Sequence, residues 1–303
     1  MASFKATLQA LGDLVTEGVE TFSATFKQSL HYDEPIQIVP YRGLGNQQWI
    51  QVSGRALEDK GETKLRDEET LWNNLAQSYQ RFESDEVAHL RVQLQFQGQT
   101  IEVLTDKEGY FTAKLPVSDL TAQGLWYDYQ VDVPVQSQLT AAFKPITGQV
   151  QIPSPPCDFG IISDIDDTLM VTNATSMLSM MRLTFLRSPA SRLPFAGVST
   201  FYQALVQGGV VPRPIFYVSS SPWNLYEFLE DFMRLNKIPL GTLFLRDFGL
   251  QTLKASHHDH KSHYIKQIMD TYPQLPFILI GDSGQHDPEI YSELLSQRPQ
   301  QVK

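Results

Sequence analysis

Residues 157–172 read CDFGIISDIDDTLMVT, and this stretch decides the fold that we expect. The apolar run at residues 159–162 is typical of a buried strand in a parallel sheet. Asp164, Asp166 and Asp167 follow where the chain leaves that strand, and ligands of open α/β sheets bind outside the carboxyl ends of the strands. Three carboxylates this close together repel one another unless a cation lies among them, and Mg²⁺ is a hard cation that prefers oxygen ligands. The sequence therefore predicts a magnesium site at this strand end.

Length and charge limit the classes of protein to consider. The chain has 303 residues, which is enough for two ordinary domains. Its formal net charge is -10 and no basic stripe is present, which argues against a nucleic-acid partner. Cys157 is the single cysteine, so an intrachain disulfide is excluded. No stretch reaches the roughly 18 apolar residues of a transmembrane helix. We expect a soluble, cytoplasmic protein, with peripheral contact to a membrane as the alternative location.

The part of the chain before the acidic stretch shows two patterns. Apolar residues spaced by three or four predict an amphipathic helix over residues 1–31. This helix packs on the protein itself, joins a second copy to form an oligomer, or lies in a membrane interface. Residues 32–152 instead alternate apolar and polar positions, which predicts strands at 49–57, 90–96, 100–106, 110–115 and 126–134. With one helix at 69–82, we expect a β-sandwich of the immunoglobulin or transthyretin type.

A proline-rich segment at residues 153–156 is the expected boundary of the last domain, which takes in residues 153–303. Further buried strands are predicted at 215–218, 242–246 and 277–280. Ser221 is expected to be the N-cap of a helix over residues 223–235, with Pro222 as its first residue.

Two features near these strands have alternative interpretations. The methionine-rich residues 173–193 either pack as a helix in the core or form a lid, and we expect apolar surface near Trp223 and Met177–Met181 to open onto the site. Four histidines at residues 257–263 indicate zinc as an alternative metal, although no cysteine accompanies them and Lys261 lies among them.

The string SDIDDTL resembles the first motif of the haloacid dehalogenase (HAD) superfamily, Asp-x-Asp-x-Thr after a hydrophobic strand. In phosphatases of that superfamily the first Asp is the nucleophile, which the resemblance assigns here to Asp164. Later strand ends look like the remaining motifs. The resemblance makes Ser219 the hydroxyl of the second motif and Lys261 the cation of the third, with Lys254 as the alternative cation. It makes Asp282 and Asp287 the acids of the fourth motif.

The resemblance implies a fold and a mechanism together. The fold class is an α/β HAD-like Rossmannoid domain with a parallel sheet, preceded by the β-sandwich and the N-terminal amphipathic helix. Mg²⁺ would be held by Asp164, the backbone carbonyl of Asp166 and Asp282. Asp164 would attack phosphorus to form an aspartyl-phosphate, and Asp166 would act as acid and then as base.

The same resemblance assigns the substrate-binding and supporting residues. The phosphate oxygens would be bound by Ser219, the N–H of Ser220 and Lys261, with Thr168 ordering the loop beside them. Asp287 and Asp167 would support the metal ligands.

Four strings together, SDIDDTL, FYVSSSPWNLYEFL, HKSHYIKQI and FILIGDSGQHDPEIY, resemble the actin-patch-associated phosphatidate phosphatase family over roughly residues 155–298. Membership would imply a Mg²⁺-dependent enzyme of lipid metabolism that hydrolyses phosphatidate to diacylglycerol. One alternative is a phosphatase or phosphotransferase that acts on a soluble phosphate monoester. The other is a non-catalytic binding module, which the retention of all the motif residues disfavours.

Overall fold

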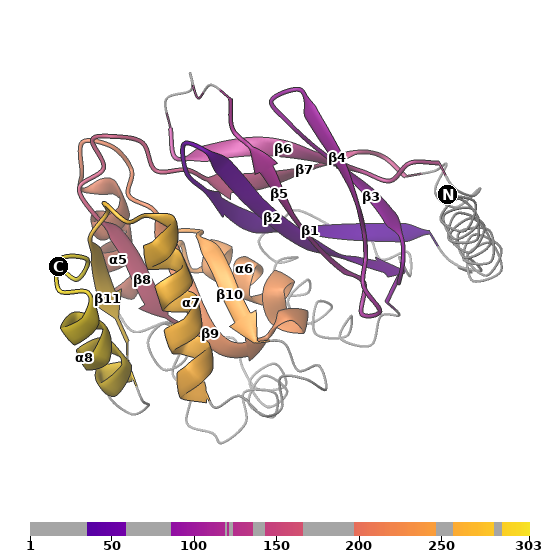
Figure 1. Ribbon diagram of the computed structural model, residues 1–303. Helices are drawn as coiled ribbons and strands as arrows, with labels where there is room; N and C mark the ends of the chain where they lie inside the picture. Colours follow the sequence, from indigo (N-terminus) through magenta and orange to yellow (C-terminus); the bar gives the residue numbers. More distant parts are fainter. Residues whose placement is uncertain are drawn as a thin grey trace, which may run out of the picture.

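The protein contains two β-sheets of different kinds, which are seen side by side in the computed structural model (Figure 1). The structure describes residues 35–58, 86–118, 120, 124–135, 143–165, 197–246, 257–281 and 287–303. The expected helices at 1–31 and 69–82, and the methionine-rich residues 173–193, lie outside these ranges.

The larger sheet has seven strands in the order β4-β3-β6-β7-β1-β2-β5. Its strands are β1 (Ile36–Gly45), β2 (Trp49–Glu58), β3 (Arg91–Phe96), β4 (Gln99–Leu104), β5 (Tyr110–Pro116), β6 (Trp126–Asp132) and β7 (Ile146–Gln151). The sheet is mixed, because β1 pairs in parallel with β7 while the other neighbouring strands are antiparallel. Its outer strands β4 and β5 also approach each other, so the sheet curls until it is nearly closed.

Local sequence explains the strands and turns of this sheet. Alternate residues of β3 and β5 are buried, which is the pattern of strands with one face on a core. Gln97 and Gly98 connect β3 to β4, and both have positive φ, as a two-residue hairpin of the I′ type requires. Asp106 accepts hydrogen bonds from the backbone N–H groups of Glu108 and Tyr110 and so forms the turn into β5. The strands and turns predicted here are confirmed.

The smaller sheet is parallel and has four strands in the order β10-β9-β8-β11. These are β8 (Gly160–Asp164), β9 (Ile215–Pro222), β10 (Thr242–Arg246) and β11 (Phe277–Ile280). The helices with it are α5 (Val198–Gln207), the short 3-10 helix η3 (Trp223–Leu225), α6 (Tyr226–Leu235), α7 (His257–Thr271) and α8 (Asp287–Gln297).

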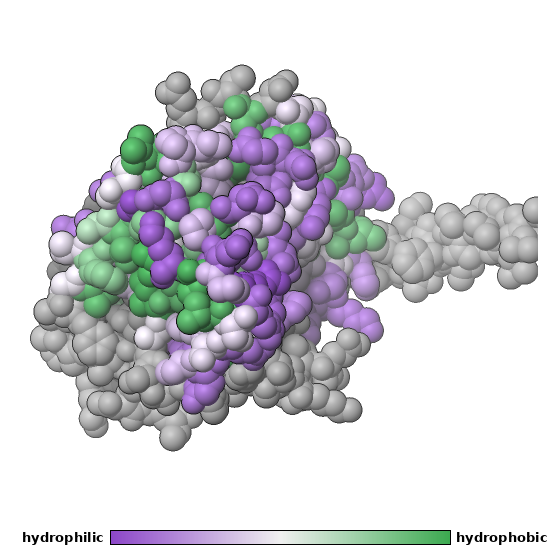
Figure 2. All heavy atoms as spheres, turned by 60° about the vertical axis from the view of Figure 1, so that its left-hand side comes forward, coloured by the Kyte–Doolittle hydropathy of each residue, from purple (hydrophilic) through white to green (hydrophobic). Residues whose placement is uncertain are grey.

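Two apolar cores cover the two faces of this parallel sheet. Neighbouring residues Ile161 and Ile162 belong to different cores, as do Phe216 and Tyr217, because side chains alternate across a strand. One core takes in α5 and α6, and the other takes in α7 and α8. Figure 2 shows the side of the molecule formed by this sheet, where apolar and polar side chains are interspersed on the described surface.

The two sheets meet where β1 and β7 contact β9 and β10. The fully buried Gln151 amide donates to the carbonyl of Ile215 over 2.9 Å and to the hydroxyl of Thr242 over 2.8 Å. Thr242 in turn donates to the carbonyl of Gly43 over 2.7 Å. Arg42 adds an ion pair of 2.7 Å with Glu230 of α6. These contacts join the sheets through buried polar groups that satisfy one another.

The expected fold class is wrong. The described chain is mostly a mixed, nearly closed seven-stranded sheet with few helices, and not a parallel α/β HAD Rossmannoid fold behind a β-sandwich. The physical reason is that β1 pairs with both β2 and β7, which joins all seven strands in one curled sheet instead of two stacked layers. The parallel sheet exists, but it is the smaller unit. Among the described residues, no helix combines the length and apolar character needed to cross a membrane.

Candidate active site

The strongest cluster of charge in the described part of the chain lies at the end of β8. The ammonium of Lys261 is 3.0 Å from Oδ1 of Asp164 and 2.8 Å from Oδ1 of Asp287. The lysine side chain is 5% exposed and each carboxylate side chain is 1% exposed. Two carboxylates and one ammonium therefore lie together in a place with little water.

Three separate elements place these side chains. Asp164 is the last residue of β8, whose five residues are all buried, and Asp287 is the first residue of α8. Lys261 lies in the first half of α7. Gly281 comes directly after β11 and lies close to Asp287. A Cβ at residue 281 would lie 2.3 Å from a carboxylate oxygen of Asp287, so the chain needs glycine at this point.

Electrostatics keep the lysine charged. Burial by itself lowers the pKa of a lysine, but the attraction of Asp164 and the hydrogen bond donated to Asp287 raise the pKa of Lys261 above its ordinary value. The positive charge of Lys261 is therefore fixed beside the carboxylate of Asp164 at this strand end.

A buried hydrogen-bond chain supports the backbone at Asp164. The hydroxyls of Tyr202 and Ser163 lie 2.7 Å apart, and Ser163 donates to the carbonyl of Asp164 over 2.8 Å. Burial raises the pKa of Tyr202 to about 12, and the charge of Asp164 acts in the same direction, although the hydrogen bond with Ser163 opposes it. Tyr202 is therefore a neutral donor at neutral pH. The sequence analysis missed it because nothing local relates α5 to this strand end.

The serines near the end of β9 lie on the strand next to this cluster. Asp164 pairs in register with Val218, so Ser219 is one residue past the level of Asp164 on the neighbouring strand. The hydroxyl of Ser219 donates to the Ser221 hydroxyl over 2.8 Å and accepts from the Ser221 N–H over 3.0 Å. Ser220 is less buried than either of them. The predicted phosphate-binding serines therefore lie at the same edge of the sheet as Asp164.

The expected helix start at Ser221 and Pro222 is wrong. Both residues belong to β9, a 3-10 turn begins at Trp223, and α6 begins at Tyr226. Neither helix has a side-chain cap hydrogen bond. The reason is that Ser221 bonds with Ser219 and that Pro222 stays in register with Arg246 of β10.

Contacts from the larger sheet fix the turn that follows these serines. The ring of Trp223 stacks on Tyr41 of β1, with centroids 4.7 Å apart and planes 15° from parallel. Asn224 accepts hydrogen bonds from Arg55 over 3.0 Å and from the hydroxyl of Tyr110 over 3.3 Å. Arg55 is also paired with Glu86, which forms an isolated bridge with Leu57 of β2. Trp223 was expected to open onto the site as apolar surface, and it instead packs at the junction of the two sheets.

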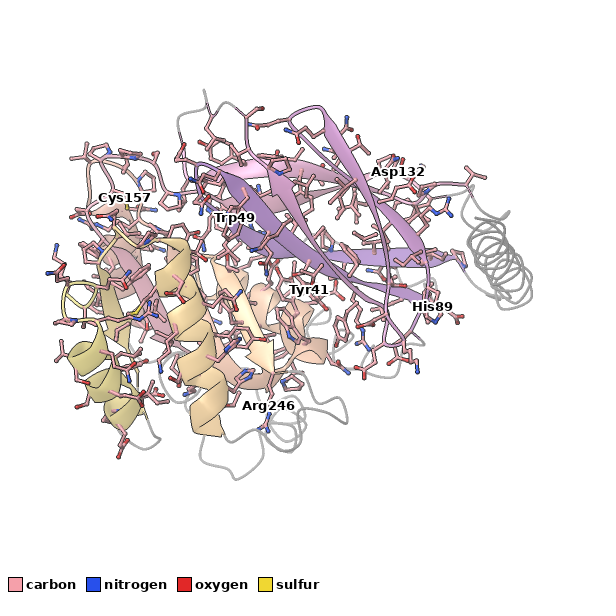
Figure 3. All side chains as sticks on the ribbon, in the orientation of Figure 1. Tyr41, Trp49, His89, Asp132, Cys157 and Arg246 are labelled. Atoms are coloured by element: carbon pink, nitrogen blue, oxygen red, sulfur yellow. The ribbon has the colours of Figure 1, made fainter. Side chains whose placement is uncertain are left out.

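Arg246 is a further charged residue at this edge that the sequence analysis missed. It is the last residue of β10, it is 9% exposed, and Figure 3 shows it at the tip of that strand. A local pattern could have identified Arg246. It directly follows the strand sequence TLFL, just as Asp164 follows the strand sequence GIIS.

The remaining predicted residues do not fall in the described ranges. These are Asp166, Asp167, Thr168, Lys254 and Asp282. Of the histidines, His260 and His263 make edge contacts with the ring of Tyr264. Among the described residues, no three His, Cys, Asp or Glu side chains are grouped as a metal site would need.

A buried lysine between two carboxylates, at the carboxyl end of a parallel sheet, lies where ligands of such sheets bind. Residues 159–303 match the family model of the catalytic domain of phosphatidate phosphatase APP1. This match supports the family prediction made from the sequence.

Two curated relatives extend this comparison. The chain is 35% identical over 151 residues to phosphatidate phosphatase APP1 of Saccharomyces cerevisiae, which covers 48% of this chain and 25% of that protein. It is 25% identical over 206 residues to an uncharacterised protein of Schizosaccharomyces pombe, which covers 66% of this chain and 33% of that protein. The chain thus spans a third or less of the length of these relatives.

One solved structure is similar over a larger share of the chain. It is a carbohydrate acetylesterase from Xanthomonas citri, 12% identical, which covers 86% of this chain and 64% of that chain. The TM-score is 0.30, which is too low to support a conclusion about the fold or function.

Proposed function

We propose that the protein is a Mg²⁺-dependent phosphatidate phosphatase that releases phosphate through an aspartyl-phosphate intermediate. The observation that carries this proposal is the buried Asp164, which lies 3.0 Å from the ammonium of Lys261 within the residues that match the family model. Phosphatidate is the substrate in the name of the yeast relative, and a phosphate monoester suits a nucleophilic carboxylate flanked by a fixed cation.

The donor set around Asp164 fits Mg²⁺. The donors of the described cluster are buried carboxylate oxygens, which are hard ligands of the kind that Mg²⁺ prefers. Asp164, the backbone carbonyl of Asp166 and Asp282 are the residues that would hold the ion. When bound, Mg²⁺ would supply positive charge that lets an anionic phosphate approach an anionic carboxylate.

The chain's own residues would then divide the chemistry. Asp164 attacks phosphorus, and the phosphoryl group passes from the leaving oxygen to the carboxylate. Lys261 binds the charge on the phosphate while Asp287 holds its ammonium in place over 2.8 Å. Asp166 protonates the leaving oxygen and later takes a proton from the water that attacks the aspartyl-phosphate.

The edge of β9 would supply the remaining phosphate contacts. The Ser219 hydroxyl and the N–H of Ser220 lie on the strand next to Asp164. In the described structure the Ser219 hydroxyl bonds with Ser221, so a bound phosphate would have to replace or share that bond. The lipid substrate would also bring the protein into peripheral contact with a membrane.

The experiment is a phosphate-release assay on the purified full chain. Phosphatidate in mixed micelles is compared with sugar phosphates and nucleotides, each with Mg²⁺ and with EDTA. We expect release from phosphatidate that needs Mg²⁺ and that falls at least a thousandfold in Asp164→Asn. Lys266→Met is the matched control, because it changes an exposed lysine of α7 outside the cluster.

Four results would count against the proposal. Unchanged activity in Asp164→Asn would rule out this nucleophile. Equal rates with EDTA would rule out the metal requirement. Faster release of phosphate from a soluble ester would show that this ester, and not phosphatidate, is the substrate. No release from any substrate would favour a binding module over an enzyme.

A further inference from the structure

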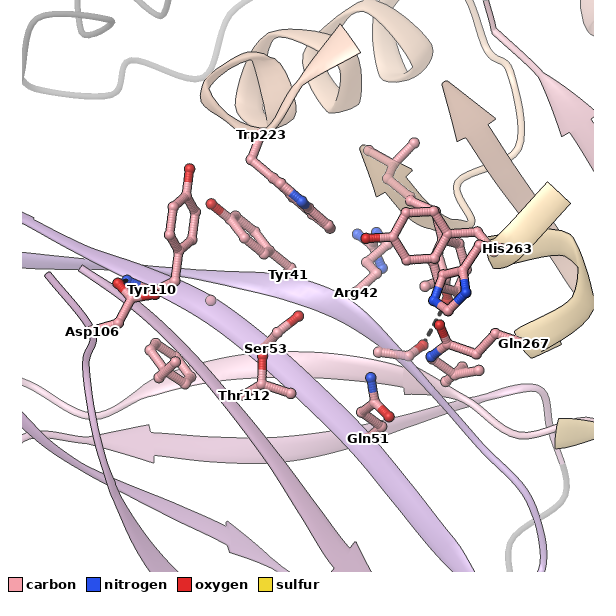
Figure 4. A pocket seen from close by; sticks show the side chains of 18 residues that line it. Tyr41, Arg42, Gln51, Ser53, Asp106, Tyr110, Thr112, Trp223, His263 and Gln267 are labelled. Atoms are coloured by element: carbon pink, nitrogen blue, oxygen red, sulfur yellow. Dashed lines mark hydrogen bonds between the residues drawn. The ribbon is translucent and has the colours of Figure 1, made fainter. Parts of the chain in front are cut away.

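A cavity of about 430 Å³ lies where the larger sheet meets the parallel sheet (Figure 4). Its floor comes from β1, β2 and β5, and its walls come from Trp223, the first three residues of β10, and α7. Small-ligand pockets have volumes of about 300 to 1,000 Å³ and often lie between domains. This cavity therefore has the size and the position of a small-molecule site.

The cavity is separate from the candidate active site. Asp164, Lys261 and Asp287 do not line it. Its β10 residues run from Thr242 to Phe244, whereas Arg246 ends that strand at the edge where the active site lies. Binding of a ligand in this cavity would accordingly not depend on the proposed phosphatase chemistry.

Small residues keep the cavity open. Ser53 and Thr112 pair in register on neighbouring strands, and their short side chains form the floor. Gly43 and Gly54 also line the cavity, and a Cβ at either position would lie 2.5 Å from a packed neighbouring atom, so the strands need glycine there to come this close. Larger side chains in place of Ser53 and Thr112 would fill the space, so the size of these two side chains helps to produce the cavity.

The polar groups that face the cavity are mostly neutral. Within the described structure, the side chains of Gln51, Ser53, Thr112 and Gln267 make no hydrogen bond with another residue. Figure 4 shows Gln51, Ser53 and Thr112 on the floor, with Gln267 on the wall opposite the aromatic residues. Amides and hydroxyls both donate and accept, so they match ligands whose groups do the same.

The charged residues of the lining are already engaged by the protein. Arg42 is paired with Glu230 over 2.7 Å. Asp106 accepts two backbone hydrogen bonds in its turn. A strongly anionic or cationic ligand would therefore compete with bonds that shape the fold, whereas a neutral ligand would not.

The opposite wall is aromatic. Tyr41, Tyr110 and Trp223 lie together on one side of the cavity in Figure 4. Aromatic rings with adjacent amide and hydroxyl groups suit a compact molecule that has C–H faces as well as hydroxyl groups.

We propose that this cavity binds a neutral, hydroxyl-rich ring, such as a sugar or a cyclic polyol. The ring would lay its C–H face against the aromatic wall and would exchange hydrogen bonds with Gln51, Ser53, Thr112 and Gln267. Such a ring could arrive free in solution or as the head group of a lipid. Because both sheets contribute to the lining, the bound ligand would bridge them.

The test uses the full chain and two forms of the probe. Saturation-transfer NMR is recorded with glucose, maltose, cellobiose and myo-inositol, and the strongest binder is titrated. In parallel, flotation is measured with phosphatidylcholine vesicles that contain or lack phosphatidylinositol. Thr112→Leu fills the floor, and Gln267→Ala removes a wall amide without touching the sheet. The control is Thr100→Leu on exposed β4, away from the cavity. Thermal melting confirms that each variant is folded.

We expect saturable binding that weakens at least tenfold in Thr112→Leu and in Gln267→Ala and that is unchanged in Thr100→Leu. If the cavity variants lose binding of the free sugar, the ligand is a soluble molecule. If they lose only flotation with the phosphatidylinositol vesicles, the ligand is a lipid head group. Two outcomes would overturn the inference: binding of none of these probes, or binding that both cavity variants leave intact.

Discussion

Replacement of Lys261 by methionine should destabilise the protein strongly, because it removes the ammonium that pairs with two buried carboxylates. At an effective dielectric constant of about 20, unit charges at 3.0 and 2.8 Å attract by roughly 5.5 and 5.9 kcal/mol. Desolvation cancels several kcal/mol for each buried ion. We therefore expect Lys261→Met to lower the free energy of unfolding by about 3 to 5 kcal/mol at pH 7.

The measurement is urea unfolding of the full chain in EDTA, so that a bound cation cannot replace the lysine. The matched control is Lys266→Met on the same helix. Lys266 pairs with Glu293 over 3.2 Å, but the two side chains are 32% and 37% exposed, so its loss should cost below about 1 kcal/mol. If both variants unfold within about 1 kcal/mol of the parent, the buried cluster does not stabilise the fold as argued.

The pH dependence of stability gives an independent check that the ion pairs of Lys261 stabilise the fold. In the parent, the pKa of Lys261 is raised above the ordinary lysine pKa of about 10.4. The stability that comes from a charged Lys261 is therefore fully present below that ordinary pKa, and it is lost as the pH rises through the folded-state pKa. In Lys261→Met the two carboxylates bind protons more readily in the folded than in the unfolded state. The deficit of the variant should therefore shrink as the pH falls from 7 toward about 4. A deficit that stays constant over this range would contradict the electrostatic explanation.

Three further predictions concern the groups around the site. Gln151→Leu removes three buried hydrogen bonds at the junction of the sheets and should lower the free energy of unfolding by about 1 to 3 kcal/mol, and a change below about 0.5 kcal/mol in urea would contradict this. Tyr202→Phe removes the bond with Ser163 and should cost about 1 kcal/mol. Because the pKa of Tyr202 is about 12, its stabilising effect is complete below the ordinary tyrosine pKa of about 10 and is lost as the pH rises to 12, so unfolding curves of the variant should depend less on pH in that window. Asn224→Ala and Arg55→Met should be coupled by about 1 kcal/mol or more in a double-mutant cycle, and additive effects would show that their 3.0 Å bond contributes nothing.

The sequence predicted the local structure of the larger sheet but not how its strands assemble. Alternation identifies which side of each strand is buried, as it does for β3 and β5, and the residues Gln97 and Gly98 specify a tight turn. Alternation is the same in a sandwich and in a curled single sheet. The parallel pairing of β1 with β7 joins residues about a hundred positions apart, and no local pattern encodes it.

Sequence and tertiary structure contributed differently to the candidate site. The apolar run before Asp164 located that residue at a strand end from local sequence alone, and the family resemblance added Lys261 and Asp287. The role expected for Ser221 was wrong because a hydrogen bond with Ser219 and strand pairing with β10 outweigh the capping preference of an isolated serine. Tyr202 could not have been found, because its contact with Ser163 depends on how α5 packs on the sheet.

The sequence by itself determined the chemistry of this protein: which residues carry charge, which segments are apolar, and which family model residues 159–303 match. Tertiary structure alone decided that Asp164 and Asp287, which are 97 and 26 residues from Lys261 in the chain, both lie within 3.0 Å of its ammonium. It also decided that two sheets enclose a cavity between them. The physical reason is that local propensities act over a few residues, whereas burial of apolar surface selects which distant segments meet.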